Sequence, residues 1–267
     1  MHTHPSLLFF NSLSAQTGIK HFSTTRNGGV SDGLFQSFNL GIYSDDFVRN
    51  ITKNRNKLAA LLKTTSEKLI IPYQTHGNNV LYVNHEIATI PKTEQIKTIY
   101  GYDATITQEQ GVFLCVTTAD CTPVLLYDKV NKAIAAIHAG WRGVVNLIID
   151  HTIIEMKKHF ETNSKDLVAV IGPSIGIEKY EVGKEVVEKL KQAGYKLDET
   201  NHFVNPESNK FHIDPKLLNK QKLIALGVGD SQIEVSNHCT YSRKDLFFSA
   251  RRQGVKSGRM LTGIMLD

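Results

Sequence analysis

Three short stretches of the chain each place a side chain that can bind a metal or act as a nucleophile beside turn-forming residues. They are QTHGNNV with His76, TADCTP with Cys121 and AAIHAGWRG with His138. If these side chains converge, two imidazoles and one thiolate give Zn²⁺ its preferred ligands and leave a fourth tetrahedral position for water or substrate. A structural zinc would need four ligands, and the sequence has no CxxC or HxxxH pair. The pattern therefore indicates an open, catalytic zinc site.

The same residues permit other chemistry. Cys121 could be a nucleophile whose thiolate is supported by His138, with Asp120 nearby, in a cysteine hydrolase or amidase that edits cell-wall precursors. A non-catalytic zinc-binding or scaffold protein is a third alternative. Copper is disfavoured, because a multicopper oxidase needs many histidines in repeated HxH pairs and this sequence has one such pair, His2 and His4. We expect Cys115, inside an apolar run, to be a small buried hydrophobic residue.

Two further stretches could bind an anion. HFSTTRNGGVSDGLFQSFNLG contains Arg26, whose planar guanidinium suits carboxylate or phosphate, among several glycines. WRGVVNLII places Arg142 at an expected helix N-terminus, where free N–H groups favour an anion. Neither stretch is a Walker or Rossmann pattern. Trp141 could stack on a flat ring, and packing in the core is at least as good an explanation.

Short apolar runs bounded by Gly, Asp or Asn predict the strands that must position these residues. Between residues 103 and 139, the runs DATIT, GVFLCVTT, TPVLLYD and KAIAAIHA follow one another without a helix. Such runs imply hairpins and a mixed sheet, which predicts an α+β fold with helices packed outside. Helical spacing predicts helices near Val48, after HAGWRG from about Val144, over residues 183–193, and from Pro215 with Asp214 as N-cap. Residues 84–100 are predicted to be a surface loop.

The composition predicts one compact domain, residues 1–267, because 41% of the 267 residues are hydrophobic and no linker divides them. No apolar run is long enough to span a membrane, and no signal peptide is apparent. Three cysteines without CxxC pairs favour a reducing compartment, so we expect a cytoplasmic protein. The net charge is +5, but basic residues are interleaved with acidic ones, as in KEVVEKLKQ, which favours a solvated surface over nucleic-acid binding.

Taken in order, the motifs resemble one family. TTRNGGVS, FNLG, QTHGNNV, DATIT, TADCTPVLLYD, AAIHAGWRG, IGPSIG..KYEVG and FFSARR....GRM are similar to the YfiH/laccase-domain family, over residues 18–266. That family carries the name of multicopper polyphenol oxidases, and its members are described as purine nucleoside phosphorylases. The resemblance implies a four-layer α/β/β/α sandwich and a zinc ion bound by His76, Cys121 and His138. It also implies phosphorolysis of adenosine, inosine and S-methyl-5′-thioadenosine, with adenosine deaminase activity.

Under this resemblance, the partners are a purine nucleoside and phosphate, and the oligomeric state is left open. The zinc ligands are the expected catalytic residues, and the candidate substrate-binding residues are Arg26, Asn39, Asp103, Asp120 and Arg142. The HxE pattern of zinc deaminases is absent after His76, so Asp103 or Asp120 would have to carry the proton. The family commonly has an aromatic residue or His after the Ser of FFS, whereas this chain has Ala250, which puts a substrate contact there in doubt.

Overall fold

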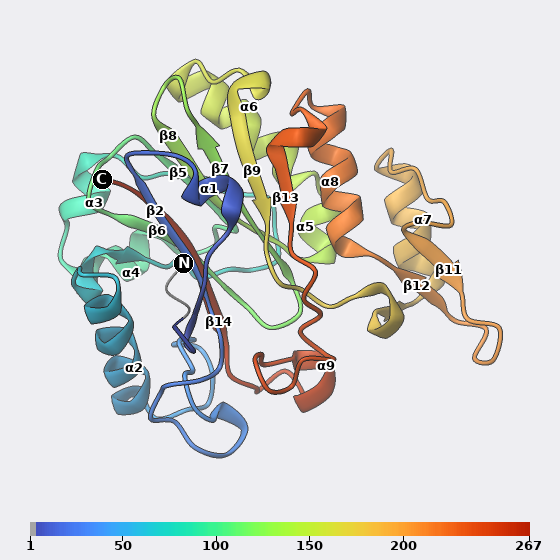
Figure 1. Ribbon diagram of the computed structural model, residues 1–267, viewed down its shortest axis with the longest axis horizontal. Coiled ribbons are helices and arrows are strands. Elements are labelled where there is room, and N and C mark those ends of the chain that lie inside the picture. Colours follow the sequence, from blue (N-terminus) through green and yellow to red (C-terminus); the bar gives the residue numbers. More distant parts are fainter. Residues whose placement is uncertain (1–3) are drawn as a thin grey trace.

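The computed structural model describes residues 4–267, and His2 of the HxH pair lies outside this range. Two large β-sheets form the centre of the molecule (Figure 1). In spatial order, the six-stranded sheet consists of β13 (Ile233–Val235), β9 (Leu167–Ile171), β7 (Thr122–Asp128), β8 (Ala133–Ala139), β5 (Ala104–Thr107) and β4 (Val80–Tyr82). The five-stranded sheet consists of β1 (Leu7–Leu8), β2 (Ile19–Thr24), β14 (Met260–Leu266), β6 (Phe113–Thr118) and β3 (Leu69–Ile70). Each sheet contains parallel and antiparallel pairs, as predicted.

The two sheets pack face to face because their strands present apolar side chains on both faces. On β6, Leu114 and Val116 enter the cluster between the sheets, where they join Leu125 and Tyr127 of β7. The alternate residues of β6 point the other way, since successive side chains of a strand face opposite sides. Cys115 is one of them and is fully buried, which confirms that it is a small core residue.

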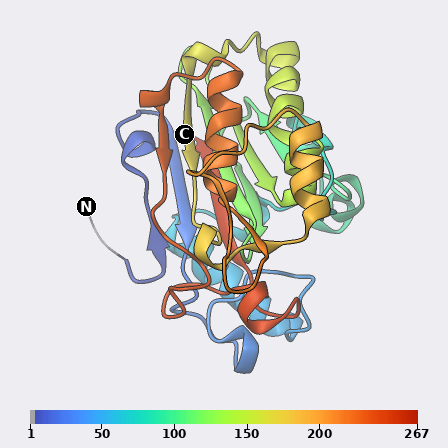
Figure 2. The ribbon, with the colours of Figure 1, turned by 90° about the vertical axis from the view of Figure 1, so that its right-hand side faces the viewer.

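Helices cover both outer faces. Leu58 of α2 (Val48–Leu61) packs with Cys115 against the five-stranded sheet. On the other side, Ile149 and Ile153 of α6 (Ile148–Phe160) and Leu218 of α8 (Pro215–Ala225) pack against the six-stranded sheet. Figure 2 shows these two helices lying over that sheet. The order helix, sheet, sheet, helix confirms the four-layer sandwich.

The remaining elements are short and lie around this core. A third sheet, of β10 (Glu181–Val182), β12 (Phe211–Ile213) and β11 (His202–Val204), stands to one side with α7 (Lys184–Gln192) (Figure 1). The other α-helices are α1 (Asn11–Ser14), α3 (His85–Thr89), α4 (Lys92–Thr98), α5 (Trp141–Val145) and α9 (Ala250–Gln253). The 3₁₀ helices are η1 (Gly33–Phe35), η2 (Ser66–Lys68), η3 (Ser164–Asp166), η4 (Ile177–Lys179) and η5 (Asp230–Gln232).

Several predicted elements need correction. Residues 84–100 form α3 and α4 instead of a loop, because the Asn84 side chain accepts a hydrogen bond from the Ile87 N–H and caps α3. The helix predicted after HAGWRG is two helices, since Leu147 has a φ of +61° and interrupts it. The helix from Pro215 is confirmed, and Asp214 accepts two backbone N–H bonds as its N-cap.

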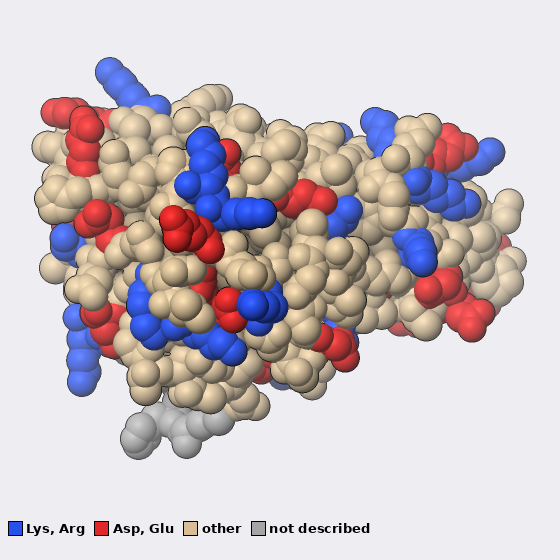
Figure 3. Space-filling view, turned by 90° about the horizontal axis from the view of Figure 1, so that it is seen from above, with Lys and Arg blue, Asp and Glu red and all other residues tan. Residues whose placement is uncertain are grey.

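None of the helices formed by residues 4–267 combines the length and the apolar content that crossing a membrane requires. Lys and Arg side chains are interspersed with Asp and Glu on the face shown in Figure 3. This distribution matches the interleaved charges of the sequence.

Candidate metal and active site

The three candidate ligands come from three segments that the two sheets bring together. His138 lies near the end of β8, and Cys121 lies in the turn that joins β6 to β7. Pairing of Pro123 with His138 places this turn beside the end of β8. His76 lies in the loop between β3 and β4, one strand from each sheet. Its φ of +60° is uncommon for a residue with a side chain, and such conformations cluster at functional sites.

The ligand atoms of His76, Cys121 and His138 all lie within 4.8 Å of one another. The Cys121 Sγ lies 3.9 Å from the His76 Nε2, and the two imidazole rings meet edge to face with centroids 4.8 Å apart. In a tetrahedral zinc site, metal–ligand bonds of about 2.0–2.3 Å place neighbouring ligand atoms about 3.4–3.6 Å apart. The three side chains are therefore close to the spacing that a shared zinc ion requires.

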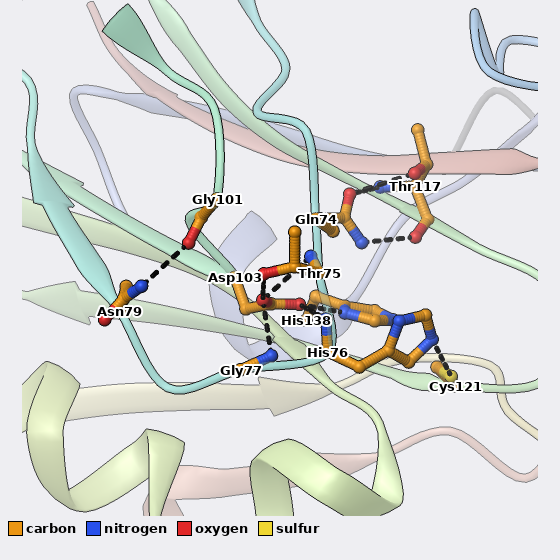
Figure 4. A network of polar contacts seen from close by, with 10 residues as sticks. All are labelled: Gln74, Thr75, His76, Gly77, Asn79, Gly101, Asp103, Thr117, Cys121 and His138. Carbon is orange, nitrogen blue, oxygen red and sulfur yellow. Dashed lines mark hydrogen bonds and ion pairs between the residues drawn. The ribbon is translucent and has the colours of Figure 1, made fainter.

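Asp103 at the start of β5 organises two of the ligands (Figure 4). Its Oδ1 accepts hydrogen bonds from the His138 Nδ1 at 2.7 Å and the His76 backbone N–H at 3.0 Å. Its Oδ2 accepts backbone N–H bonds from Gly77 at 2.7 Å and Thr75 at 3.1 Å. Asp103 is fully buried, so one carboxylate both orients the His138 ring and fixes the His76 loop.

Gln74 fixes the same loop to the five-stranded sheet (Figure 4). Its Oε1 accepts hydrogen bonds from the Thr117 backbone N–H at 2.8 Å and the Thr117 hydroxyl at 2.9 Å. Its Nε2 donates to the Thr117 carbonyl at 2.9 Å. The His76 loop is thus held from both sheets.

Burial and neighbouring charges act against each other in the ionisation of the site. Burial raises the pKa of Asp103, but the bond and charge of His138 and the backbone N–H groups outweigh it and leave that pKa below its ordinary value. Burial also raises the pKa of the Cys121 thiol, yet His138 and His76 together lower it to about 6. Burial lowers the pKa of His138, whereas Cys121 and Asp103 raise it to about 9. Without metal, the site favours a thiolate beside an imidazolium at neutral pH.

A cavity of about 300 Å³ opens onto these residues. His76, Cys121 and His138 line it together with two tyrosines and two arginines, Tyr43, Tyr73, Arg55 and Arg259. Among the described residues, no Asp or Glu lines this cavity. A volume of this size lies at the lower end of small-molecule sites.

Most residues of this lining carry no functional signal in the sequence. Arg55 lies in TKNRNK, which is typical of a solvated helix face, and Arg259 lies in SARRQGVKSGRM, whose basic residues and glycines are typical of a solvated loop. Tyr73 directly precedes the QTHG motif. This closeness in sequence to His76 is the one feature from which Tyr73 could have been predicted as a site residue.

Two predicted substrate-binding residues support the backbone instead of lining the cavity. Asn39 is fully buried, and its Oδ1 accepts backbone N–H bonds from Gly41 at 3.1 Å and Arg259 at 2.9 Å. The two oxygens of Asp120 accept hydrogen bonds from two hydroxyl groups and one backbone N–H, those of Thr240, Ser249 and Arg251. Neither of the two acids proposed to carry a proton, Asp103 and Asp120, lines the cavity.

The two arginines predicted to bind phosphate also lie outside the cavity. Arg26 donates to the carbonyls of Gln36 and Lys244 and lies 4.8 Å from the Phe248 ring centroid. Arg142 is exposed and stacks 4.4 Å from the ring centroid of Trp141, and both line a separate hollow. Ala250 does line the cavity, where its methyl group offers no hydrogen bond.

Comparison with known proteins is in line with this geometry. The model of the family described as multi-copper polyphenol oxidoreductase laccase matches residues 20–267. The chain belongs to this laccase-like family. The finding confirms the resemblance seen in the sequence motifs.

Several proteins are similar to this chain over nearly its whole length. A purine nucleoside phosphorylase from Bacteroides thetaiotaomicron is 44% identical over 97% of this chain and 96% of its own length. The adenosine deaminase RL5, from an unknown prokaryotic organism, is 37% identical over 92% of this chain and 94% of its own length. The crystal structure of the Bacillus licheniformis hypothetical protein YfiH superimposes with a TM-score of 0.90 at 31% identity, over 99% of this chain and 97% of that one.

Proposed function

We propose that this protein is a zinc-dependent purine nucleoside phosphorylase that also deaminates adenosine. The observation that carries the proposal is the convergence of His76, Cys121 and His138 in the wall of a cavity that tyrosines also line. Relatives named purine nucleoside phosphorylase and adenosine deaminase support it. We infer adenosine, inosine and S-methyl-5′-thioadenosine as nucleosides and phosphate as the second substrate. The single domain and the cytoplasmic location expected from the sequence stay predictions.

The donor set supports zinc. One thiolate and two imidazoles are ligands that zinc accepts readily, whereas the copper clusters of oxidases need repeated histidine pairs that the sequence lacks. Asp103 adds the carboxylate partner that zinc-bound histidines commonly have. When bound, zinc would supply a Lewis acid that polarises a substrate atom or lowers the pKa of a bound water to about 7.

The protein's own residues prepare this site. Asp103 stays ionised and accepts the Nδ1 proton of His138, which leaves the Nε2 lone pair of that ring for the metal. Its bonds to the His76 loop and those of Gln74 to β6 hold the loop in place before metal or substrate arrives. Such preorganisation lowers the cost of assembling the site during turnover.

Tyrosines along the cavity supply a surface for a purine ring. Tyr43 and Tyr73 meet edge to face with centroids 4.3 Å apart, and Tyr73 stacks on Tyr100 at 4.5 Å with an interplanar angle of 6°. Tyr43 and Tyr73 line the cavity, and Tyr43 remains 54% exposed. Stacking of a base on an aromatic side chain is worth about 1–3 kcal/mol, so this cluster suits the base of a nucleoside.

The proposal is tested by incubating adenosine with the zinc-loaded protein, with and without phosphate, and separating the products by chromatography. We expect adenine only when phosphate is present, and a smaller amount of inosine in both conditions. The Cys121→Ala variant should fold, because this residue lies in a turn and is only partly buried, but should form neither product. Equal turnover by this variant and the wild type would defeat the metal assignment.

A second candidate is a cysteine hydrolase or amidase. The specific observation in its favour is the ionisation of the site, in which a lowered Cys121 pKa faces a raised His138 pKa and Asp103 orients the imidazole. Chelation separates the two functions. Activity that is lost with a chelator and restored by zinc supports the metal enzyme, whereas activity that survives chelation and is lost on alkylation of Cys121 supports the hydrolase.

A further inference from the structure

Arg55 brings a different kind of binding group to the cavity. Its backbone belongs to α2, which covers the outer face of the five-stranded sheet, and its side chain lines the cavity. The Nε and Nη2 atoms donate to the Leu40 carbonyl at 3.1 and 2.9 Å. A guanidinium has five N–H groups, so three remain, including both on Nη1. Among residues 4–267, the Nη1 of Arg55 has no hydrogen-bond partner.

The charge of Arg55 also lacks a partner. Within the part of the chain that the structure describes, no carboxylate oxygen lies within 4.0 Å of its guanidinium. Burial lowers the pKa of Arg55 to about 10, although the nearby Cys115 and Tyr43 act to raise it, so the side chain is still a cation at neutral pH. Arg55 is partly buried, and a cation shielded from water without a counter-ion is unfavourable, so a bound anion offsets that cost.

Arg259, the other arginine of the cavity, is already engaged. Its Nη1 donates to the carbonyls of Ser257 and Gly258, and its Nη2 donates to the carbonyl of Val255 at 2.7 Å. These bonds engage three of its five N–H groups with the chain's own turn, namely both on Nη1 and one on Nη2, and the side chain also packs over Gly41, where any Cβ would come within 2.6 Å of it. Arg259 therefore shapes the wall, and Arg55 keeps free donors.

We propose that Arg55 binds the phosphate co-substrate through the N–H groups of Nη1 and Nη2 that the Leu40 carbonyl leaves free. A planar guanidinium edge matches two phosphate oxygens, and such charge-assisted pairs are the stronger class of hydrogen bond. The inference rests on the proposed phosphorolysis. It assigns the phosphate to a residue of α2 and away from Arg26 and Arg142.

The test measures phosphate dependence in the zinc-loaded wild type and in three variants. Arg55→Gln should raise the KM for phosphate about 10- to 100-fold and leave the KM for adenosine unchanged, because it removes a charged hydrogen-bond donor pair. Arg55→Lys keeps the charge without the planar edge and should give a smaller increase. Arg142→Gln is the matched control, since it removes one positive charge from an exposed site outside the cavity, and its KM for phosphate should equal that of the wild type.

A second readout needs no turnover. Inorganic phosphate should raise the melting temperature of the wild type and of Arg142→Gln, but not that of Arg55→Gln at the same concentration. Zinc content and the melting temperature without phosphate report whether each variant folds. If Arg55→Gln does not fold, the KM for phosphate and the phosphate-induced thermal shift of Arg55→Lys test the inference instead.

Two results for the Arg55 variants would overturn the inference. One is an unchanged phosphate KM and thermal shift in a folded Arg55 variant, and the other is an increase in the KM for adenosine alone. A larger phosphate effect from Arg142→Gln would also count against it. A wild type that forms no adenine refutes the phosphorylase instead, and the phosphate-induced thermal shift then tests Arg55 separately.

Discussion

Replacement of Asp103 by Asn is the sharpest test of how this site holds a metal. Each carboxylate oxygen accepts two N–H groups, from His138 and His76 on one side and from Gly77 and Thr75 on the other. An amide has only one accepting oxygen, so its NH₂ group must face two donors in either orientation. The substitution therefore cannot preserve the network.

Both orientations of the amide weaken the metal site. If the NH₂ group faces His138, the Nδ1 of that ring must become an acceptor, and the proton moves to the Nε2 that should bind the metal. If it faces Gly77 and Thr75, two backbone N–H groups lose their acceptor at about 1–3 kcal/mol each and the His76 loop is released. Loss of such a carboxylate partner lowers metal affinity about 10- to 100-fold, which corresponds to about 1.4–2.7 kcal/mol.

The assay is competition for zinc between the protein and a chromophoric chelator, with phosphorolysis measured at limiting and at saturating zinc. Asp128→Asn is the matched control, because Asp128 is also fully buried and accepts backbone N–H bonds from Val130 and Asn131. It lies at the opposite end of β7 from Cys121, about 20 Å away along the strand. Wild-type zinc affinity in a folded Asp103→Asn variant would refute the reasoning.

Three further outcomes are expected. In metal-free protein, the rate of Cys121 alkylation, measured by mass spectrometry, should rise with pH around 6 and level off by neutrality, because the thiolate forms above its lowered pKa. A midpoint near pH 9 would contradict this. Gly140→Ala should weaken zinc binding, since a Cβ there would lie 3.1 Å from His76 and 3.2 Å from Cys121, whereas Gly77→Ala, with its nearest contacts at 3.6 Å, should bind zinc normally. Asp214→Ala should lower the free energy of unfolding by about 0.5–2 kcal/mol in denaturant titrations without changing zinc affinity, as it removes the N-cap of α8.

The sequence predicted best those features that depend on local pattern. Long apolar runs such as those of β7 and β8 identified the strands, and Asp214 before Pro215 identified a helix start. The sequence did not predict β2, where the polar residues His21, Ser23 and Thr24 are buried inside the sheet. For example, the hydroxyl groups of Ser23 on β2 and Thr262 on β14 hydrogen-bond to each other at 2.8 Å. No local pattern in the sequence indicates that these two residues are partners. Helices α3 and α4 escaped notice because a side-chain cap, and not apolar periodicity, starts the first of them.

What the sequence by itself determined was the chemistry available, namely one thiol and two imidazoles at turns and strand ends, in motifs that belong to a known family. Only the tertiary structure decided which groups act together. In the folded chain, Asp103 hydrogen-bonds to His138, and Asp120 and Asn39 accept buried hydrogen bonds. The side chain of Arg55, from an otherwise ordinary polar helix, lines the cavity. The reason is that a side chain's role follows from its partners across the two sheets, and pairing between distant segments leaves no local pattern in the chain.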